Sequence, residues 1–261
     1  MSRPCRVLVH GALGRMGQCV RAAIEAEPAA ALAAALEAPS HPRLGEEVAP
    51  GVRVGADLAA ALAASDVAIA FAPPAPTVAL VRDAAARGLP CAVGTTGLAP
   101  GERAEIEALA ARVPIVLTAN FSVAVNVLFH LTRRAAELLG PGYDAEILEV
   151  HHRTKVDAPS GTALTLAKAV EEGRRAAAAH VLAREGLTGP RPKDAIGLQA
   201  LRGGDNPGEH TVMFLGVGER LELAHRAATR DHFARGALRA ALWLRGRTPG
   251  LYDMEQVLGL R

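Results

Sequence analysis

The sequence predicts an α/β protein of two domains, the first a doubly wound parallel sheet and the second an α+β domain. In the first half of the chain, short apolar runs alternate with helical stretches, the pattern of parallel strands joined by crossover helices. Past residue 121, strand-like runs are separated by hairpin-length glycine turns, which favour a mixed, largely antiparallel sheet. Because 50% of the 261 residues are hydrophobic, the chain can bury a sizeable core.

The first apolar strand, at residues 6–9, runs directly into a glycine-rich turn and a helix at 18–25. The glycines follow the spacing Gly-x-x-Gly-x-x-Gly, a variant of the dinucleotide fingerprint in which backbone amides approach a pyrophosphate closely. An ordinary tight strand-to-helix connection is the alternative interpretation. The candidate cofactor-binding residues of this turn are Gly11, Ala12, Leu13, Gly14, Arg15 and Met16.

A second strand, at residues 30–36, strengthens the nucleotide interpretation. It ends in Glu37, at about the distance expected of the acid that binds the adenosine ribose hydroxyls. Further strands and helices then alternate, at 67–71, 77–87, 90–93, 101–112 and 115–117. The first domain is therefore expected to have a Rossmann-type sheet.

Two polar loops fall beyond the carboxyl ends of these strands, where ligands bind in such sheets. Turn chemistry alone could also explain their composition. As candidates for the nicotinamide side of a cofactor we take Gly94, Thr95, Thr96, Thr118, Ala119, Asn120 and Phe121.

After residue 121 the pattern changes to a long apolar helix followed by the runs of a second sheet. The helix is expected at 123–139, and the strands at 145–150, 195–201, 210–217 and 220–226. A last helix at 231–245 has an apolar side and is expected to return to the first domain. The dinucleotide-binding domain is thus assigned to 1–121 with 231–261, and the substrate-binding domain to 122–230.

The densest group of acid, base and anion-binding side chains directly follows the strand at 145–150. His151 and His152 can pass a proton near neutral pH, while Arg153 and Lys155 add positive charge. A surface or structural role is the alternative for the histidine pair. A metal site is not expected, because adjacent strand residues point to opposite sides and no further ligand follows at zinc spacing.

A helix start lies only a few residues beyond the histidines. Ser160 is expected to cap a helix at 162–170. The amides of its first turn would then face back toward the histidines and bind a carboxylate or phosphate. The expected ligand is a small anion.

The bulk composition excludes several classes of protein. A net charge of +2 with no basic stripe, and only 3% aromatic residues, argue against nucleic acid as a partner. No stretch approaches the about 18 apolar residues that a membrane span requires, and no signal-peptide core is evident. The odd, unpatterned set of Cys5, Cys19 and Cys91 suits a reducing cytoplasm.

Three separated motifs stand in one order, at residues 11–17, at 94–97 with 119–122, and at 149–163. Together they resemble the 4-hydroxy-tetrahydrodipicolinate reductase family, formerly called dihydrodipicolinate reductases. The likeness extends over nearly the whole chain, including residues 208–211 and 218–222. The third motif is highly specific to that family.

The resemblance implies an NADH- or NADPH-dependent reductase of lysine and diaminopimelate biosynthesis, acting on a small cyclic dicarboxylate. By family likeness His151 is the general acid/base and Lys155 the proton donor. His152 is expected to touch the substrate, and Gly161 and Thr162 to hold a carboxylate. The family also implies a homotetramer formed through the sheets of the second domain.

Two departures from the family pattern concern the cofactor. Members often carry Arg after the ribose-binding acid, to hold the 2′-phosphate of NADPH, whereas here Glu37 is followed by Ala38, Pro39 and Ser40. With only His41 and Arg43 nearby, NADH is expected to serve at least as well as NADPH. Residues 70–73 lack the polar groups common in the family, so no cofactor contact is assigned there.

Two other functions remain open from the sequence. One is another amino-acid-pathway dehydrogenase of the same plan, such as an aspartate- or homoserine-type enzyme. The other is a nucleotide-sensing module without catalysis. The presence of His151 and Lys155 argues against a sensor, since a sensor needs no proton donor beside an anion site.

Overall fold

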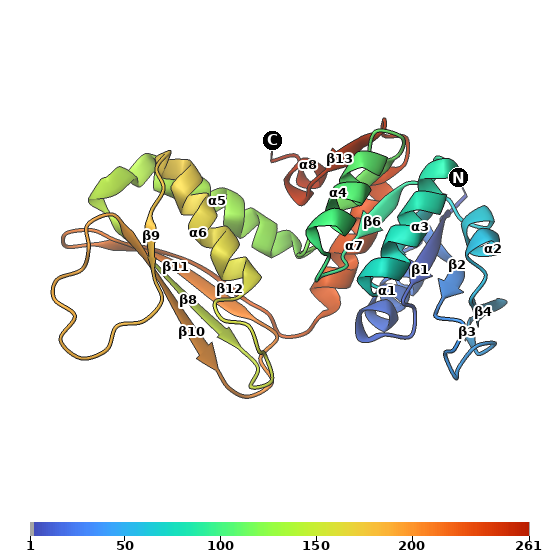
Figure 1. Ribbon diagram of the computed structural model, residues 1–261, viewed down its shortest axis with the longest axis horizontal. Helices are drawn as coiled ribbons and strands as arrows, with labels where there is room; N and C mark the ends of the chain where they lie inside the picture. The colour runs from blue at the N-terminus through green and yellow to red at the C-terminus, as the bar shows by residue number, and fades with distance from the viewer. Residues whose placement is uncertain (1–2, 261) are drawn as a thin grey trace. The chain divides into compact units, whose positions relative to one another are not determined.

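The structure of the protein, a computed structural model, describes residues 3–260. The chain forms two compact units (Figure 1). Unit 1 comprises the chain up to Val123 and again from Arg230, and unit 2 comprises Ala124–Thr229. Each unit has its own sheet and its own core. Within residues 3–260, no helix is both long enough and apolar enough to cross a membrane.

Unit 1 is built on an eight-stranded sheet of order β13-β7-β6-β5-β1-β2-β4-β3. All neighbouring strands are parallel except β3 and β4. The order runs outward from β1 in both directions, so the predicted doubly wound sheet is confirmed. The strands are β1 Cys5–His10, β2 Ala30–Leu36, β3 Glu47–Ala49, β4 Val52–Gly55, β5 Val67–Ala70, β6 Cys91–Val93, β7 Pro114–Leu117 and β13 Gly250–Tyr252.

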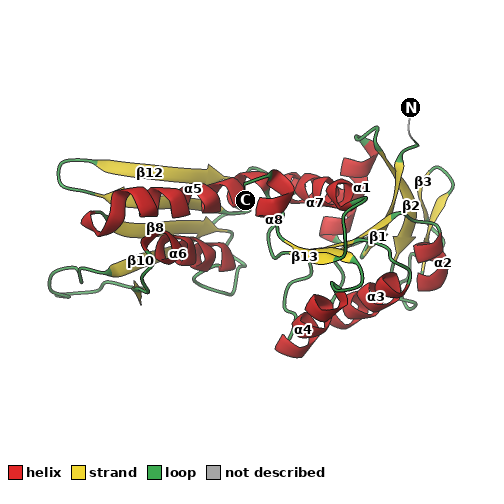
Figure 2. Ribbon diagram, turned by 90° about the horizontal axis from the view of Figure 1, so that it is seen from above, coloured by secondary structure: helices red, strands yellow, loops and turns green. Residues whose placement is uncertain are grey.

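Helices cover both faces of this sheet (Figure 2). Val7 and Val9 of β1 point toward α1, α7 and α8, whereas Leu8 points toward α2, α3 and α4, as alternation along a strand requires. Two-sided burial explains why the central strands are continuous apolar runs in the sequence. The helices are α1 Arg15–Glu25, α2 Leu58–Ala63, α3 Pro74–Ala86, α4 Pro100–Leu109, α7 Asp231–Leu244 and α8 Met254–Leu258.

Unit 2 contains a five-stranded sheet of order β12-β11-β8-β10-β9. Strand β11 is antiparallel to β8 and β12, whereas β10 is parallel to β8 and β9; the sheet is mixed, as predicted, with both kinds of pairing equally represented. Helices α5 and α6 pack on one face of it. The elements are α5 Val123–Leu139, η1 Gly140–Gly142, β8 Asp144–His151, α6 Gly161–Arg174, β9 Ala179–Val181, β10 Ala195–Arg202, β11 Glu209–Leu215 and β12 Arg220–Arg226.

The glycine-rich loop at residues 203–208 differs from the expectation. The sequence predicts a hairpin turn there, which is wrong, because β8 lies between β10 and β11. The loop therefore crosses the end of β8, about 10 Å at the usual strand spacing. Gly203 N donates to the carbonyl of His151 (3.0 Å), and His152 N donates to the carbonyl of Asn206 (2.9 Å). The crossing places this loop against the histidine segment.

Within residues 3–260, six short strands and helices besides η1 have no counterpart in the sequence predictions. Each has three to six residues, too few for a periodic pattern to emerge. They are β3, β4, α2, β9, β13 and α8. Strand β9, Ala179–Val181, lies between the predicted helix at 162–170 and the predicted strand at 195–201.

Candidate active site

The end of β8 carries a carboxylate and an imidazole, Glu149 and His151. Buried and half-buried residues alternate along this strand, so Glu149 and His151, two positions apart, point to the same buried side. Glu149 is 1% exposed and His151 8% exposed. A carboxylate at that depth needs donors around it.

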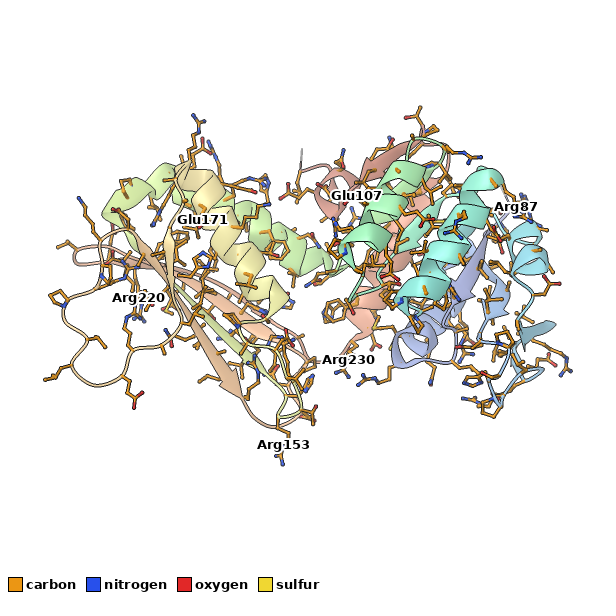
Figure 3. All side chains as sticks on the ribbon, in the orientation of Figure 1. Arg87, Glu107, Arg153, Glu171, Arg220 and Arg230 are labelled. Atoms are coloured by element: carbon orange, nitrogen blue, oxygen red, sulfur yellow. The ribbon has the colours of Figure 1, made fainter. Side chains whose placement is uncertain are left out.

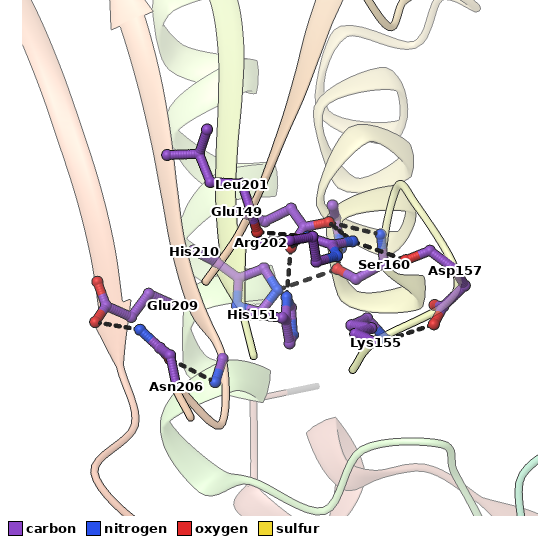
Figure 4. A network of polar contacts seen from close by, with 12 residues as sticks. Glu149, His151, Lys155, Asp157, Ser160, Leu201, Arg202, Asn206, Glu209 and His210 are labelled. Atoms are coloured by element: carbon purple, nitrogen blue, oxygen red, sulfur yellow. Dashed lines mark hydrogen bonds and ion pairs between the residues drawn. The ribbon is translucent and has the colours of Figure 1, made fainter. Parts of the chain in front are cut away.

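Four hydrogen bonds surround the Glu149 carboxylate (Figure 4). Arg202 donates two of them, at 2.8 and 2.9 Å, and the backbone N–H of Ser160 donates a third at 3.1 Å. The fourth joins the carboxylate to Nδ1 of His151. Arg202 comes from β10, where it pairs with His151 of β8. These four residues are called the carboxylate network below.

The network shifts the acidity of both members at its centre. Burial would raise the pKa of Glu149, but the hydrogen bonds from Arg202 and His151 outweigh burial and hold that pKa below its ordinary value. Burial lowers the pKa of His151, and Glu149 opposes this effect. Near neutral pH, Glu149 is therefore ionised and the imidazole of His151 is largely neutral.

A second buried histidine stands beside the network. His210 of β11 is 4% exposed, and its ring lies 5.2 Å from that of His151, edge to face. Its Nε2 is 3.2 Å from Ser160 Oγ. Burial lowers the pKa of His210 to about 3, so this ring is a neutral wall of the site. In residues 3–260, no three His, Cys, Asp or Glu side chains are grouped to hold a metal ion.

Lys155 lies on the loop between β8 and α6. Its Nζ donates to Asp157 at 2.7 Å, and this hydrogen bond lowers the pKa of Asp157. Arg202, already bound to Glu149, also donates to the carbonyl of Asp157 at 2.7 Å. Arg153 is exposed, and its side chain extends outward from the loop (Figure 3). The positive charge expected from Arg153 is therefore not part of the network.

The start of α6 closes the site as expected. Ser160 is the N-cap, and its Oγ accepts from Ala163 N at 3.2 Å, which confirms the predicted cap. Gly161 and Thr162 are the first two residues of the helix, the positions whose amides a helix leaves without an intrahelical acceptor. His152, half-buried, is hydrogen-bonded through Nδ1 to Thr154 Oγ1 at 2.7 Å.

The glycine turn of unit 1, residues 11–17, is packed so closely that Gly11 and Gly17 leave no room for a side chain. Gly11 has a φ of +79°, and a Cβ on it would lie 3.0 Å from the Phe71 carbonyl. A Cβ on Gly17 would come within 2.0 Å of the Gly11 carbonyl. Glu37, next after β2, accepts a hydrogen bond from Leu13 N at 2.6 Å. This turn is called the glycine cradle below.

A cavity of about 450 Å³ adjoins the start of α1 in unit 1. It brings together seven of the predicted cofactor residues: Arg15, Met16, Gly94, Thr95, Thr96, Ala119 and Phe121. Thr118 and Asn120 are outside this lining and hydrogen-bond to each other instead. The hydroxyl of Thr95 is buried against Thr77 and the Ala72 carbonyl, so it serves the fold.

Comparison with known sequences decides the family. The family model "Dihydrodipicolinate reductase, N-terminus" matches residues 5–121, and "Dihydrodipicolinate reductase, C-terminus" matches residues 124–258. The chain is 48% identical over 265 aligned residues to the 4-hydroxy-tetrahydrodipicolinate reductase of Anaeromyxobacter dehalogenans strain 2CP-1, covering 98% of each.

The chain belongs to the dihydrodipicolinate reductase family.

A second relative in this family, from Thiobacillus denitrificans, is 48% identical and covers 98% of this chain and 99% of its own. Among solved structures, the dipicolinate-bound dihydrodipicolinate reductase from Paenisporosarcina sp. TG-14 matches with a TM-score of 0.80 at 22% identity, over 96% of this chain and 97% of that one. That likeness supports the fold. The predicted family, fold class and class of enzyme, an NAD(P)H-dependent oxidoreductase, are confirmed.

Several residues of this candidate site escaped the sequence predictions. In unit 2 they are Glu149, Asp157, Arg202 and His210. In unit 1 the cavity is also lined by Phe71, Ala72, Pro73, Arg230 and Phe233. Glu149 offered one signal, since it lies two residues before His151 on a strand and therefore on the same face.

Proposed function

We propose that this chain reduces 4-hydroxy-tetrahydrodipicolinate to tetrahydrodipicolinate, with NADH or NADPH as reductant, in lysine and diaminopimelate biosynthesis. The observation that carries the proposal is the buried Glu149–His151 pair beside Lys155 and the start of α6. These groups combine proton transfer with anion binding in one place. A nucleotide sensor would have no use for proton transfer.

The cofactor is proposed to bind over the glycine cradle. Gly11, Ala12, Leu13 and Gly14 are proposed to lie against its pyrophosphate, with the amides of the first turn of α1, which begins at Arg15, as donors, and Glu37 is proposed to bind a ribose hydroxyl. When bound, the reduced nicotinamide supplies a hydride. The remaining proposed contacts are Arg15, Met16, Gly94, Thr95, Thr96, Thr118, Ala119, Asn120 and Phe121.

The substrate is proposed to bind in unit 2. Its ring takes up a hydride and one proton and releases water, so the site needs a proton source. His151 is proposed as general acid/base and Lys155 as proton donor. His152 and the amides of Gly161 and Thr162 are proposed to hold the carboxylates, since helix-start amides bind anions.

NADH is proposed to serve at least as well as NADPH. The Glu37 carboxylate would repel a 2′-phosphate. Arg43 is engaged by Glu46, with Nε 2.6 Å from Oε2. The test is kcat/KM with each cofactor, and a preference for NADPH above about tenfold would contradict the proposal. Glu46→Gln should free Arg43 and improve NADPH use, whereas Glu47→Gln, which loses the separate pair with Arg53, should not.

A homotetramer formed through the sheets of unit 2 is also proposed. The face of that sheet turned away from α5 and α6 carries apolar residues, among them Leu148, Met213 and Leu201, which is 52% exposed. Exposed apolar sheet faces often serve as interfaces. Sedimentation should give a tetramer, and Leu201→Arg should weaken it. Leu182→Arg, at a residue 54% exposed beyond β9, is the control. A monomeric wild type would contradict the proposal.

A cytoplasmic location is proposed from the cysteines. Cys5, Cys19 and Cys91 are free, and two of them are buried, which suits a reducing compartment. Cell fractionation would test the location, and recovery of the protein outside the cytoplasm would contradict it.

The proposed reaction is tested with purified protein and substrate made in situ from pyruvate and aspartate semialdehyde. Oxidation of NADH or NADPH, with tetrahydrodipicolinate identified as product, is the expected result. Oxidation that needs only aspartate semialdehyde would favour the other dehydrogenase class. Cofactor binding without any oxidation would favour the sensor.

A further inference from the structure

We propose that Glu149, held by Arg202, is a positioning residue that keeps the proton of His151 on Nδ1 and presents Nε2 to the substrate. The proposal rests on the function proposed above, since it describes how the same site is organised. Glu149 itself lies 1% exposed behind the histidine and acts through it.

The hydrogen bonds around Glu149 dictate the tautomer. Arg202 and Ser160 N–H can only donate, and together they occupy both oxygens. An ionised carboxylate only accepts, so the remaining contact requires His151 Nδ1 to donate. With its proton on Nδ1, the neutral imidazole has Nε2 as its acceptor, and the protonated ring has Nε2–H as its acid.

The loop at 203–208 approaches His151 Nε2 through a residue without a side chain. Gly208 packs against this atom, and a Cβ added to Gly208 would lie 2.9 Å from it. Gly208 N is held by Asn206 Oδ1 at 2.8 Å. The side of the imidazole opposite Glu149 is therefore bordered by backbone without a side chain.

Arg202 joins the two proton-handling groups. Its guanidinium binds both oxygens of Glu149 and also the carbonyl of Asp157, and the carboxylate of Asp157 holds Lys155. Arg202 thus contacts both Glu149, which is bonded to His151, and Asp157, which is bonded to Lys155. Arg202 is 20% exposed, so its charge balances Glu149 within a largely enclosed site.

The charges around His151 predict how its titration responds to Glu149. The charged neighbours are Glu149 on its own strand, Arg202 on β10 and Lys155 on the loop, while His210 on β11 is neutral. Glu149 raises the pKa of His151, and the two cations lower it. Removing the carboxylate charge should move the titration of His151 to lower pH.

The test compares Glu149→Gln with Glu146→Gln. Glu146 lies three residues earlier on β8, on the opposite face of the sheet, is also bound by arginines, Arg184 and Arg191 at 2.8 Å each, and contacts no histidine in the described hydrogen-bond network. With the amide N–H₂ of a glutamine at 149 facing His151 Nδ1, two donors would meet. The imidazole would then favour the tautomer with its proton on Nε2. We expect kcat to fall about 10²- to 10⁴-fold, the pH limb of kcat to move to lower pH, and NADH affinity to be retained. Glu146→Gln should leave the pH limb in place.

The tautomer is also measured directly in the folded wild type, from the ¹⁵N chemical shifts of His151. Protonated Nδ1 and bare Nε2 above the pKa are expected. Protonated Nε2 would overturn the inference even if Glu149→Gln does not fold. So would an active, folded Glu149→Gln with an unmoved pH limb. A wild type that oxidises no cofactor with the substrate would instead reject the proposed function and leave the tautomer result standing.

Discussion

The carboxylate network at the end of β8 and the glycine cradle at the end of β1 are built in opposite ways. The network depends on side chains, because four polar groups converge on one buried carboxylate. The cradle depends on missing side chains, because a Cβ at Gly11 or Gly17 would meet backbone. Removing atoms should therefore damage the first, and adding atoms should damage the second.

The largest effect is expected from Lys155→Ala, which removes the proposed proton donor. Turnover should fall about 10²- to 10⁴-fold, while NADH affinity changes little, because Lys155 belongs to unit 2 and the cradle to unit 1. Steady-state kinetics and cofactor titration measure the two quantities. Equal damage to both would mean that Lys155 is misassigned. Lys168→Ala, at an exposed position on α6, is the control.

Gly17→Ala adds a single methyl group to the cradle. The new Cβ would lie 2.0 Å from the Gly11 carbonyl, so the turn must shift. We expect a loss of about 1–3 kcal/mol in the free energy of unfolding together with weaker cofactor binding. Gly101→Ala in α4, where a Cβ meets nothing within 4 Å, should instead stabilise the helix. Unchanged stability and affinity in Gly17→Ala would refute the steric account of the cradle.

Gly208→Ala tests whether the carboxylate network also depends on a neighbouring residue that has no side chain. Gly208 has a φ of +145°, and a Cβ added to it would lie 2.9 Å from His151 Nε2. Turnover should fall about tenfold or more, as expected of a small displacement of a catalytic group. Gly203→Ala in the same loop meets nothing within 4 Å and should retain activity. Full activity in Gly208→Ala would show that this approach to Nε2 is unimportant.

The smallest effect is expected from a change at Asp66. This residue directly precedes β5 and pairs with Arg3 and Arg6 at the amino end of β1, the end opposite the cradle. Burial would raise the pKa of Asp66, but hydrogen bonds from Arg6 and Arg3 lower it to about 2, below its ordinary value of 3.8. A depressed pKa contributes stability that is complete above the ordinary value and is lost as the pH falls from about 4 toward 2. Asp66→Asn should cost about 1 kcal/mol at neutral pH, with catalysis unchanged.

Urea titrations at neutral pH and at about pH 2 measure that difference. The gap between wild type and Asp66→Asn should close at the lower pH. A gap of the same size at both values would mean that the ion pairs of Asp66 contribute nothing.

Local sequence patterns were sufficient where one segment carries all the information. The strand at 30–36 and the helix at 123–139 have the predicted bounds, because hydrophobic periodicity depends on a segment's own two faces. The Ser160 cap is likewise local, since the capping hydroxyl and the amide of Ala163 are three residues apart. The order of the three motifs was enough to indicate the family.

Only the tertiary structure decided which distant residues complete each site. Arg202 reaches Glu149 because β10 pairs beside β8, and His210 joins them because β11 pairs on the other side of β8. Arg230 and Phe233 line the cavity because the end of the chain returns to unit 1. Strand order is set by burial over the whole sheet, so the segments that carry the motifs do not contain that information.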